Sequence, residues 1–295
     1  MPNALTLFAN SAAGSMQSEL LYDLWHELIP LEYRGETFFK DPASSFSATL
    51  EQALADCDRR NSSLIVAGGD GTVSSVVNAI AGTKRTFGVL PQGTFNFFAR
   101  SKGIPLDLRA ALKFALNAQA MSIPLAYLND HAFLVNVGLG LYPKVIAARE
   151  AHQQYSGRSG VSAIVSGVWT LLRERHLSHA HLQYDGRDQR LSTPLLMISH
   201  NREQLQQLDQ RFSLGAERLA VLHMRPVSSW RLLKLLVNGL TGRLLDEDQM
   251  ICFAVDDICV RMRKRSVRVA LDGELMHMSL PLKFKVIANG IRCLL

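Results

Sequence analysis

Cysteines are few in this sequence, and their spacing does not match that of common metal sites. The four are scattered along the chain and form no Cys-x-x-Cys pair: Cys57, Cys252, Cys259 and Cys293. Disulfide frameworks and zinc sites usually show cysteines at closer, regular spacing. We therefore expect reduced thiols in a cytoplasmic protein, without a zinc site or a disulfide scaffold.

Long hydrophobic runs are also missing, although 47% of the residues are hydrophobic. No window holds the run of about 18 apolar residues that marks a transmembrane helix. The N-terminus lacks the basic region and apolar stretch of a secretory signal. The sequence therefore predicts a cytoplasmic protein of one large or two modest domains, with peripheral association at the inner face of the membrane.

Acidic residues are fewer than basic ones, 26 against 32, which gives a formal charge of +6. A basic balance favours anionic partners. The densest basic cluster is Arg261, Arg263, Lys264, Arg265 and Arg268. Because no aromatic residues or nucleic-acid motifs accompany this cluster, we expect contact with an anionic membrane surface and none with nucleic acid. The alternative is a solvated hairpin tip.

Strand and helix patterns alternate over residues 1–125. Strands are predicted at 5–9, 35–39, 64–67 and 87–90, and helices at 16–28, 45–57, 73–81 and 106–117. Alternation of this kind is typical of a parallel sheet covered by helices, with ligands outside the carboxyl ends of the strands. The sequence predicts an α/β N-terminal domain with a parallel sheet.

Residues 126–295 are rich in strand patterns instead. Strands are predicted at 177–184, 195–199, 219–224, 250–254, 258–262, 267–271 and 282–287, and helices at 161–172 and 230–237. Short alternating segments predict a mainly antiparallel β-sandwich as a C-terminal domain, with the last residues packing back on the first domain. The two helices are expected to pack in the core, and membrane docking is their alternative role.

A glycine turn follows the apolar run Leu64–Ala67. It reads Gly68, Gly69, Asp70, Gly71 and Thr72, and a helix pattern follows it. Glycines let the backbone approach an anion closely, and a helix N-terminus directs free N–H groups toward it. Asp70 would repel phosphate unless it binds Mg²⁺ or a nucleotide hydroxyl. The turn predicts a nucleotide triphosphate site, and a plain loop is the alternative.

Two further segments strengthen this prediction. Residues 88–100 again read as a strand, a glycine turn and a helix start, and they include Gly93, Thr94 and Asn96. Residues 269–274 contain Asp272, Gly273 and Glu274 after a strand pattern. The three segments contain the G-G-D-G-T string at 68–72, a partial G-T-x-N-D-x-A-R string at 93–100 and the L-D-G-E string at 271–274. In these strings the chain resembles the diacylglycerol kinase catalytic family. That family includes bacterial lipid kinases and sphingosine kinases.

This resemblance implies an enzyme of lipid metabolism, a kinase that uses ATP and Mg²⁺. It implies that a hydroxyl of a membrane lipid such as diacylglycerol is phosphorylated, as in phospholipid biosynthesis. The nucleotide-binding residues would be Asn10, Gly14, Gly68, Gly69, Asp70, Gly71, Thr72, Gly93, Thr94 and Asn96. Asp70 would also contact the metal. Asp272 would act as general base, with Glu274 as its support or its alternative.

The sequence departs from the family pattern at three places. Phe97 stands where the family string has Asp, no acid stands near 122–125, and the loop at 215–219 lacks its usual Asp-Gly. These departures put the metal network in question. They motivate a second hypothesis, a non-catalytic regulator that binds nucleotide or lipid. A soluble kinase of the NAD kinase type is the third. The oligomeric state stays open, with a dimer among the options.

Overall fold

The computed structural model describes residues 4–11, 18–40, 44–144, 146–147, 178–201, 215, 217–226 and 250–295. The predicted helices at 161–172 and 230–237 lie outside these residues, as does Gly14. The chain divides into two compact units. Unit 1 comprises residues 1–125 and 287–295, and unit 2 comprises residues 126–286.

Unit 1 is built around a parallel sheet. Its strands are β1 (Leu5–Asn10), β2 (Arg34–Lys40), β3 (Ser63–Gly68) and β4 (Thr86–Pro91). They lie in the order β2-β1-β3-β4, and every neighbouring pair is parallel. All six residues of β3 are buried, which is usual for a central strand covered on both faces. The predicted α/β fold of the N-terminal part is confirmed.

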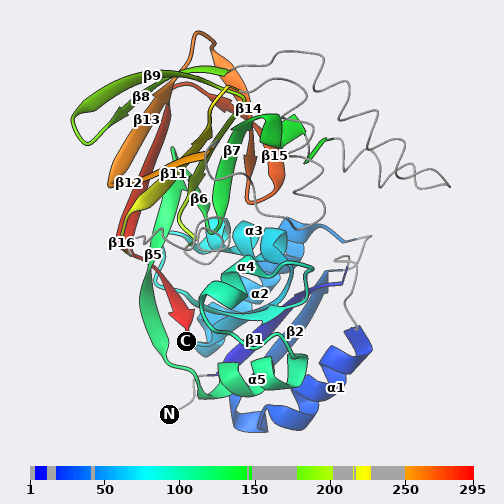
Figure 1. Ribbon diagram of the computed structural model, residues 1–295. Coiled ribbons are helices and arrows are strands. Elements are labelled where there is room, and N and C mark those ends of the chain that lie inside the picture. The colour runs from blue at the N-terminus through cyan, green and yellow to red at the C-terminus, as the bar shows by residue number, and fades with distance from the viewer. Residues whose placement is uncertain are drawn as a thin grey trace, which may run out of the picture. The chain divides into compact units, whose positions relative to one another are not determined.

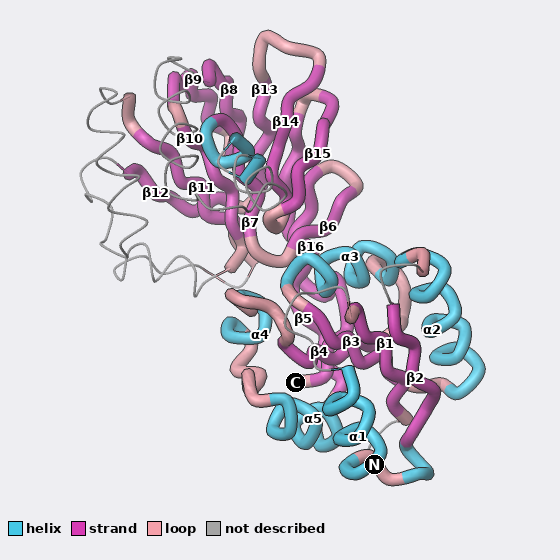
Figure 2. Tube along the Cα trace, turned by 90° about the vertical axis from the view of Figure 1, so that its right-hand side faces the viewer, coloured by secondary structure: helices cyan, strands magenta, loops and turns pink. Residues whose placement is uncertain are grey.

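Helices cover both faces of this sheet, as Figures 1 and 2 show. They are α1 (Ser18–Leu28), η1 (Leu31–Tyr33), α2 (Phe46–Arg60), α3 (Asp70–Ile80), α4 (Phe97–Ser101) and α5 (Leu108–Asn117). One core cluster joins the apolar stripes of α1 and α5 to one face of β1 and β3, with Trp25 fully buried. The helix α2 packs on β1 and β2, and α3 packs on β3.

Unit 2 is antiparallel and rich in strands. Its short strands are β6 (His131–Phe133), β7 (Asn136–Gly140), β8 (Ser178–Tyr184), β9 (Arg187–Thr193), β10 (Leu195–Ser199), β11 (Leu219–Met224), β12 (Met250–Val255), β13 (Asp257–Arg261), β14 (Ser266–Leu271) and β15 (Glu274–Ser279). One sheet runs β12-β11-β10-β7-β14-β15. In the other, β9, β8 and β13 pair in turn. One apolar cluster contains residues of both sheets, including Leu182, Val260 and Ile198, so the predicted β-rich C-terminal region is confirmed.

Two long strands carry the chain between the units. They are β5 (Ala120–Leu128) and β16 (Leu282–Leu294). The first residues of β16 pair with β13 in unit 2, and Arg292 and Cys293 pair in parallel with β4 in unit 1. The strand predicted at 282–287 is therefore too short. Asn289-Gly290 is a common turn signal, but here Gly290 lies so close to β5 that an added Cβ would be 2.5 Å from the Leu125 Cβ.

The described cysteines form no disulfide. Burial raises the pKa of the Cys293 thiol to about 12, which leaves it protonated and unreactive at neutral pH. Within the described ranges, no helix has the length and apolar character needed to cross a bilayer.

Candidate functional site

The first part of the candidate site lies at the carboxyl ends of β3 and β4. After β3, Gly69 takes an extended conformation and serves as N-cap of α3, which begins at Asp70. The N–H groups of the first helical turn have no partner within a helix, so they are available to an anion. The adjacent strand ends at Pro91, and the Gln92 N–H donates to the Gly68 carbonyl at 3.0 Å. This bond ties the two predicted glycine turns together.

The two turns approach each other closely at glycine residues. A Cβ added at Gly93 would lie 2.7 Å from the Gly69 Cα, and one added at Gly69 would lie 3.2 Å from the Gly93 Cα. A Cβ at Gly68 would lie 2.6 Å from the Thr72 Cβ. The contact at Gly93 is under 3.0 Å and is made with backbone, so it could not be kept without backbone movement, whereas the contact at Gly69 needs its neighbour to give by a few tenths of an ångström. These glycines therefore bring the turns together, in addition to leaving their own N–H groups accessible.

The Asp70 carboxylate joins the two turns a second time. Its Oδ2 accepts from the Phe97 N–H at 3.1 Å and its Oδ1 accepts from the Phe98 N–H at 3.2 Å. The side chain thus caps the short helix α4, where Asn96 itself provides no side-chain cap. Each carboxylate oxygen can accept one more bond, so this capping leaves Asp70 able to bind a cation or a hydroxyl as well.

Asn96 shapes the second turn from within. Its backbone is left-handed, with φ of 51°, a conformation that asparagine tolerates better than most residues. Its buried side chain accepts from the Gly93 N–H at 2.9 Å and donates to the Gly93 carbonyl at 2.8 Å. Thr94, between them, is exposed. Asn96 and Gly93 therefore fix the turn, and Thr94 is the member of the predicted set that faces solvent.

Asn10, at the end of β1, contacts the first of the two glycine turns through Thr72. Its Nδ2 donates to the Thr72 Oγ at 2.9 Å, so the Thr72 hydroxyl proton is left to donate elsewhere. The Asn10 Oδ1 is buried and has no hydrogen-bond partner among the described residues. Of the predicted nucleotide-binding residues, the structure brings together those on β1, on the 68–72 turn and on the 93–96 turn.

The second part of the candidate site is the hairpin between β14 and β15 in unit 2. Asp272 and Gly273 both have positive φ, 48° and 92°, and link the paired residues Leu271 and Glu274. Two-residue turns of this kind favour Asp-Gly because the first residue tolerates φ above zero and glycine adopts it freely. The hairpin therefore has a structural explanation, whatever chemistry it serves.

Asp272 is held by a segment far away in the sequence. Its Oδ2 accepts from the Leu134 N–H at 2.8 Å, and its Oδ1 accepts from the N–H groups of Val135 and Asn136 at 2.8 and 3.0 Å. Three backbone donors stabilise the negative charge and fix the carboxylate's orientation. Glu274, at the start of β15, is exposed.

Sequence reasoning did not find these partners. The N–H donors of Asp272 lie 136 to 138 residues earlier in the chain, and the donors of Asp70 lie 27 and 28 residues later. Backbone N–H groups carry no side-chain signal. The one available hint was the αL-tolerant Asn96 just before the apolar pair Phe97-Phe98.

At two of the places that depart from the family pattern, the residues have other partners or neighbours here. The Phe97 ring stacks on the half-exposed Phe95 ring at a centroid distance of 5.3 Å and an angle of 6°. In the 215–219 loop, Arg218 donates to Asp256 at 2.7 Å and to Asp185 at 3.4 Å. Within the described residues, no group of three His, Cys, Asp or Glu side chains gathers as a metal site would require.

Comparison with known proteins assigns the first part of the chain. Residues 4–128 match the family model described as the diacylglycerol kinase catalytic domain. This part of the chain is therefore similar to that catalytic domain. The resemblance predicted from the glycine turns of unit 1 is thereby confirmed.

Among curated relatives, a Cronobacter sakazakii protein named probable lipid kinase YegS-like is 34% identical over 154 residues. That match covers 51% of this chain and 48% of the relative. A Klebsiella pneumoniae protein of the same name is 36% identical over 107 residues, or 36% of each chain. The chain thus matches half or less of the length of these two relatives.

Solved structures agree on the fold. A putative diacylglycerol kinase from Bacillus anthracis superposes with a TM-score of 0.71 at 17% identity, over 99% of this chain and 95% of that one. Another, also described as a putative diacylglycerol kinase from Bacillus anthracis, gives 0.72 at 15% identity, over 99% and 97%. Both units therefore have the fold of these proteins.

Proposed function

We propose that this protein is an ATP-dependent lipid kinase that phosphorylates a hydroxyl of a membrane lipid such as diacylglycerol. The observation that carries this proposal is the pair of glycine turns, joined by Asp70 and by the Gly69–Gly93 approach, within the part of the chain that is similar to a diacylglycerol kinase catalytic domain. The names of the relatives support the lipid acceptor.

In this proposal, unit 1 holds the nucleotide. The N–H groups of the 69–72 turn and the Thr72 hydroxyl donate to phosphate oxygens, while the Asn10 amide holds that hydroxyl in place. Mg²⁺ would arrive with the triphosphate and neutralise charge that develops during transfer. Asp70 fits as its protein ligand, because magnesium is usually bound through one or two carboxylates plus substrate phosphates.

Unit 2 supplies the base. Asp272 accepts the proton of the acceptor hydroxyl, whose oxygen forms the new bond to the γ-phosphorus as the bond to ADP breaks. The three N–H bonds fix the orientation of the carboxylate before the alcohol binds. A positioned general base of this kind contributes about a hundredfold to ten-thousandfold in rate.

A non-catalytic regulator of the same fold is the second candidate. The observation that favours it is the stacked Phe97, which stands in place of an acid beside the nucleotide turn. Such a protein would bind ATP without transferring phosphate. A kinase of the NAD kinase type is the third candidate, and its acceptor would be soluble.

The test is transfer of radioactive γ-phosphate from ATP and Mg²⁺ in three parallel reactions. One contains a total bacterial lipid extract, one contains NAD, and one contains no acceptor. We expect label in the organic phase of the first reaction only. Label in the NAD reaction alone would establish the third candidate. Measurable ATP binding with no transfer in any reaction would establish the second. Peripheral binding to an anionic membrane, which the lipid acceptor requires, is part of the same proposal.

A further inference from the structure

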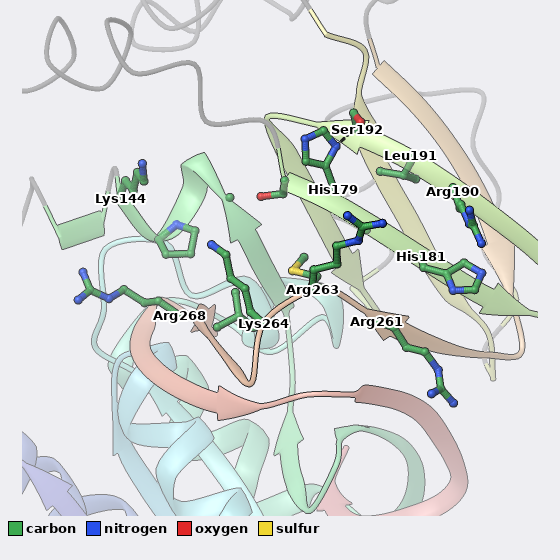
Figure 3. Close-up of a pocket in the computed structure, with 16 residues that line it drawn as sticks. Lys144, His179, His181, Arg190, Leu191, Ser192, Arg261, Arg263, Lys264 and Arg268 are labelled. Carbon is green, nitrogen blue, oxygen red and sulfur yellow. Dashed lines mark hydrogen bonds between the residues drawn. The ribbon is translucent and has the colours of Figure 1, made fainter.

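A cavity of about 960 Å³ opens in unit 2. Figure 3 shows its lining side chains, which come from β8 and β9, from the end of β7 with the residues after it, and from the turn between β13 and β14. The volume is at the upper end of the range for small-molecule sites. Paired strands form part of its wall, and the β13–β14 turn contributes the exposed Arg263 and Lys264.

The described lining of this cavity is strongly cationic. Six Lys or Arg residues line it, with no Asp or Glu among the described lining residues: Lys144, Arg190, Arg261, Arg263, Lys264 and Arg268. His179 and His181 add two imidazoles. In Figure 3, Arg263 and Lys264 extend from the β13–β14 turn, with Arg261 and Arg268 on either side. So many cations around one hollow repel one another, and a bound anion would relieve that repulsion.

Most of these cations have no acidic partner. Four of them have no acidic partner among the described residues: Arg261, Arg263, Lys264 and Arg268. Arg190 is close enough to Asp188 to help lower the pKa of that carboxyl group. Elsewhere in the described chain, arginines are commonly paired, as Arg85 is with Asp58 and Arg109 with Glu27. The unpaired cations around the cavity are therefore free to bind a ligand.

Neutral side chains orient the basic groups. The Arg261 Nε donates to the Gln183 Oε1 at 3.0 Å, and the His179 Nδ1 lies 2.7 Å from the Ser192 Oγ. His181 contacts Asp188, a carboxylate of β9 that does not line the cavity. The contacts of Arg261 and His179 thus orient these basic groups through neutral partners, and only His181 among the three has an acidic one.

The cavity is separate from the Asp272 hairpin within unit 2. Val267 and Arg268, which line the cavity, stand at the start of β14, whereas Asp272 follows its last residue. Likewise Gly140 lines the cavity at the end of β7, while Asn136 at its start donates to Asp272. Strands of five or six residues span about 17–20 Å, so the two sites lie at opposite ends of the same strands.

We propose that this cavity binds a phosphate-bearing anion through Arg263, Lys264 and their basic neighbours. Guanidinium groups match phosphate oxygens with paired N–H donors, and ammonium groups supply point charge. No Phe, Tyr or Trp is among the described lining residues, so the described lining offers no ring on which a base could stack. The phosphate belongs either to a lipid headgroup or to a soluble phosphate compound. This site adds to the phosphoryl-transfer function and does not depend on it.

The test compares three full-length proteins: wild type, the cavity variant Arg263→Gln/Lys264→Gln, and the control variant Arg187→Gln/Lys285→Gln. The control also removes one Arg and one Lys from exposed positions in unit 2, and neither residue lines the cavity. All three keep the glycine turns of unit 1, so binding of phosphate there is common to them. Each is titrated with inorganic pyrophosphate by calorimetry. Each is also sedimented with vesicles of phosphatidylcholine, with or without phosphatidylglycerol.

The expected result is binding about tenfold or more weaker in the cavity variant than in the control, because each lost charge-assisted contact is worth roughly a factor of ten. Loss of pyrophosphate binding assigns the site to soluble phosphates, and loss of phosphatidylglycerol binding alone assigns it to a headgroup. The proposal is overturned if the two variants bind equally in both arms, or if the wild type binds neither probe.

Discussion

Asp70 in unit 1 and Asp272 in unit 2 both stand in glycine turns and both accept backbone N–H groups from a distant segment. Asp70 takes two such bonds of 3.1 and 3.2 Å, and Asp272 takes three of 2.8 to 3.0 Å. In each case a carboxylate fastens a local turn to another part of its unit. The two acids differ in what surrounds them.

The Asp70 turn opens an eleven-residue helix, whose first N–H groups are available to an anion. The Asp272 turn joins two paired strands, whose N–H groups are largely used within the sheet. The first turn thus offers positive character with one carboxylate beside it, and the second offers negative charge on a rigid support. The comparison teaches that the same residue type can stand beside free helix N–H groups in one unit and on a rigid hairpin in the other, which is the basis of the two roles proposed above.

The largest effect is expected from Asp272→Asn. Asparagine tolerates the left-handed backbone at this position but is a far weaker base, so lipid phosphorylation should fall by about a hundredfold or more. Its amide also replaces one acceptor of the three N–H bonds, which should cost about 1–3 kcal/mol of unfolding free energy. Turnover and urea unfolding measure the two effects separately.

The control for this variant is Glu274→Gln, which changes an exposed acid on the same hairpin. It should retain folding stability, and its turnover shows whether Glu274 supports Asp272. Turnover at the wild-type level in Asp272→Asn would remove that residue from the role of base and leave it a hairpin anchor.

Asp70→Ala should act on nucleotide binding. Loss of the carboxylate removes a cap of α4 and the proposed magnesium ligand, so the affinity for ATP and Mg²⁺ should drop by about tenfold. The matched control is Asp107→Ala, because Asp107 caps α5 through a 2.9 Å bond from the Ala110 N–H. Both variants should lose about 0.5–2 kcal/mol of stability. Equal ATP affinity in the two, measured by calorimetry, would show that Asp70 is only a cap.

Gly93→Ala tests whether the two turns of unit 1 must touch. The new Cβ would lie 2.7 Å from the Gly69 Cα. A backbone atom moves aside less easily than the far end of a flexible side chain does. We expect a loss of about 1–3 kcal/mol in stability and a weaker ATP affinity. The comparison variant is Gly69→Ala, whose Cβ would lie 3.2 Å from the Gly93 Cα and should cost less. If thermal unfolding ranks them in the opposite order, the close approach is not what constrains these positions.

The smallest effect on function is expected from a carboxylate that serves structure alone. Asp56 is buried, and burial raises its pKa, but hydrogen bonds from Thr6, Arg59 and Arg60 outweigh this and leave the pKa below the usual 3.8. The folded state therefore binds this proton less tightly than the unfolded chain does. Asp56 should stabilise the protein at neutral pH, and this contribution should be lost as the pH falls below about 3.8 through the lower folded value.

The variant Asp56→Asn checks that direction. Its unfolding free energy should be lower than the wild type's at neutral pH, and the difference should shrink in acid. Urea unfolding at both pH values measures it. A difference that grows as the pH falls would contradict the assigned direction of the pKa shift. ATP affinity should be unchanged, which separates Asp56 from Asp70.

Much of the fold could be predicted from sequence because its signals are local. The buried strand β3 is a continuous apolar run ending in glycine, and β10 and β11 have the bounds predicted for them. The full length of β16 could not be predicted, because Asn289-Gly290 reads as a turn and only contact with Leu125 explains the glycine. A helix start was predicted within 88–100, where α4 begins at Phe97, but its cap could not be predicted, since the cap comes from Asp70 rather than from the flanking residues.

For the candidate site, too, some features could be predicted from the sequence and others could not. Glycine-rich strings mark the residues of the turns, because glycine is required where backbones approach closely. The strings do not reveal which N–H groups each carboxylate accepts. Those partners depend on how the units fold, so the capping role of Asp70 and the anchoring of Asp272 became visible only in three dimensions.

Hydrogen exchange of the full-length protein, with and without ATP and Mg²⁺, tests most directly whether the unit 1 turns hold the nucleotide. The account predicts that amides in 69–72 and 93–98 exchange more slowly when ATP is bound, since phosphate oxygens would accept from the first turn and the second is fastened to it. Unchanged exchange in both turns under conditions where calorimetry shows ATP bound would contradict it and place the nucleotide elsewhere.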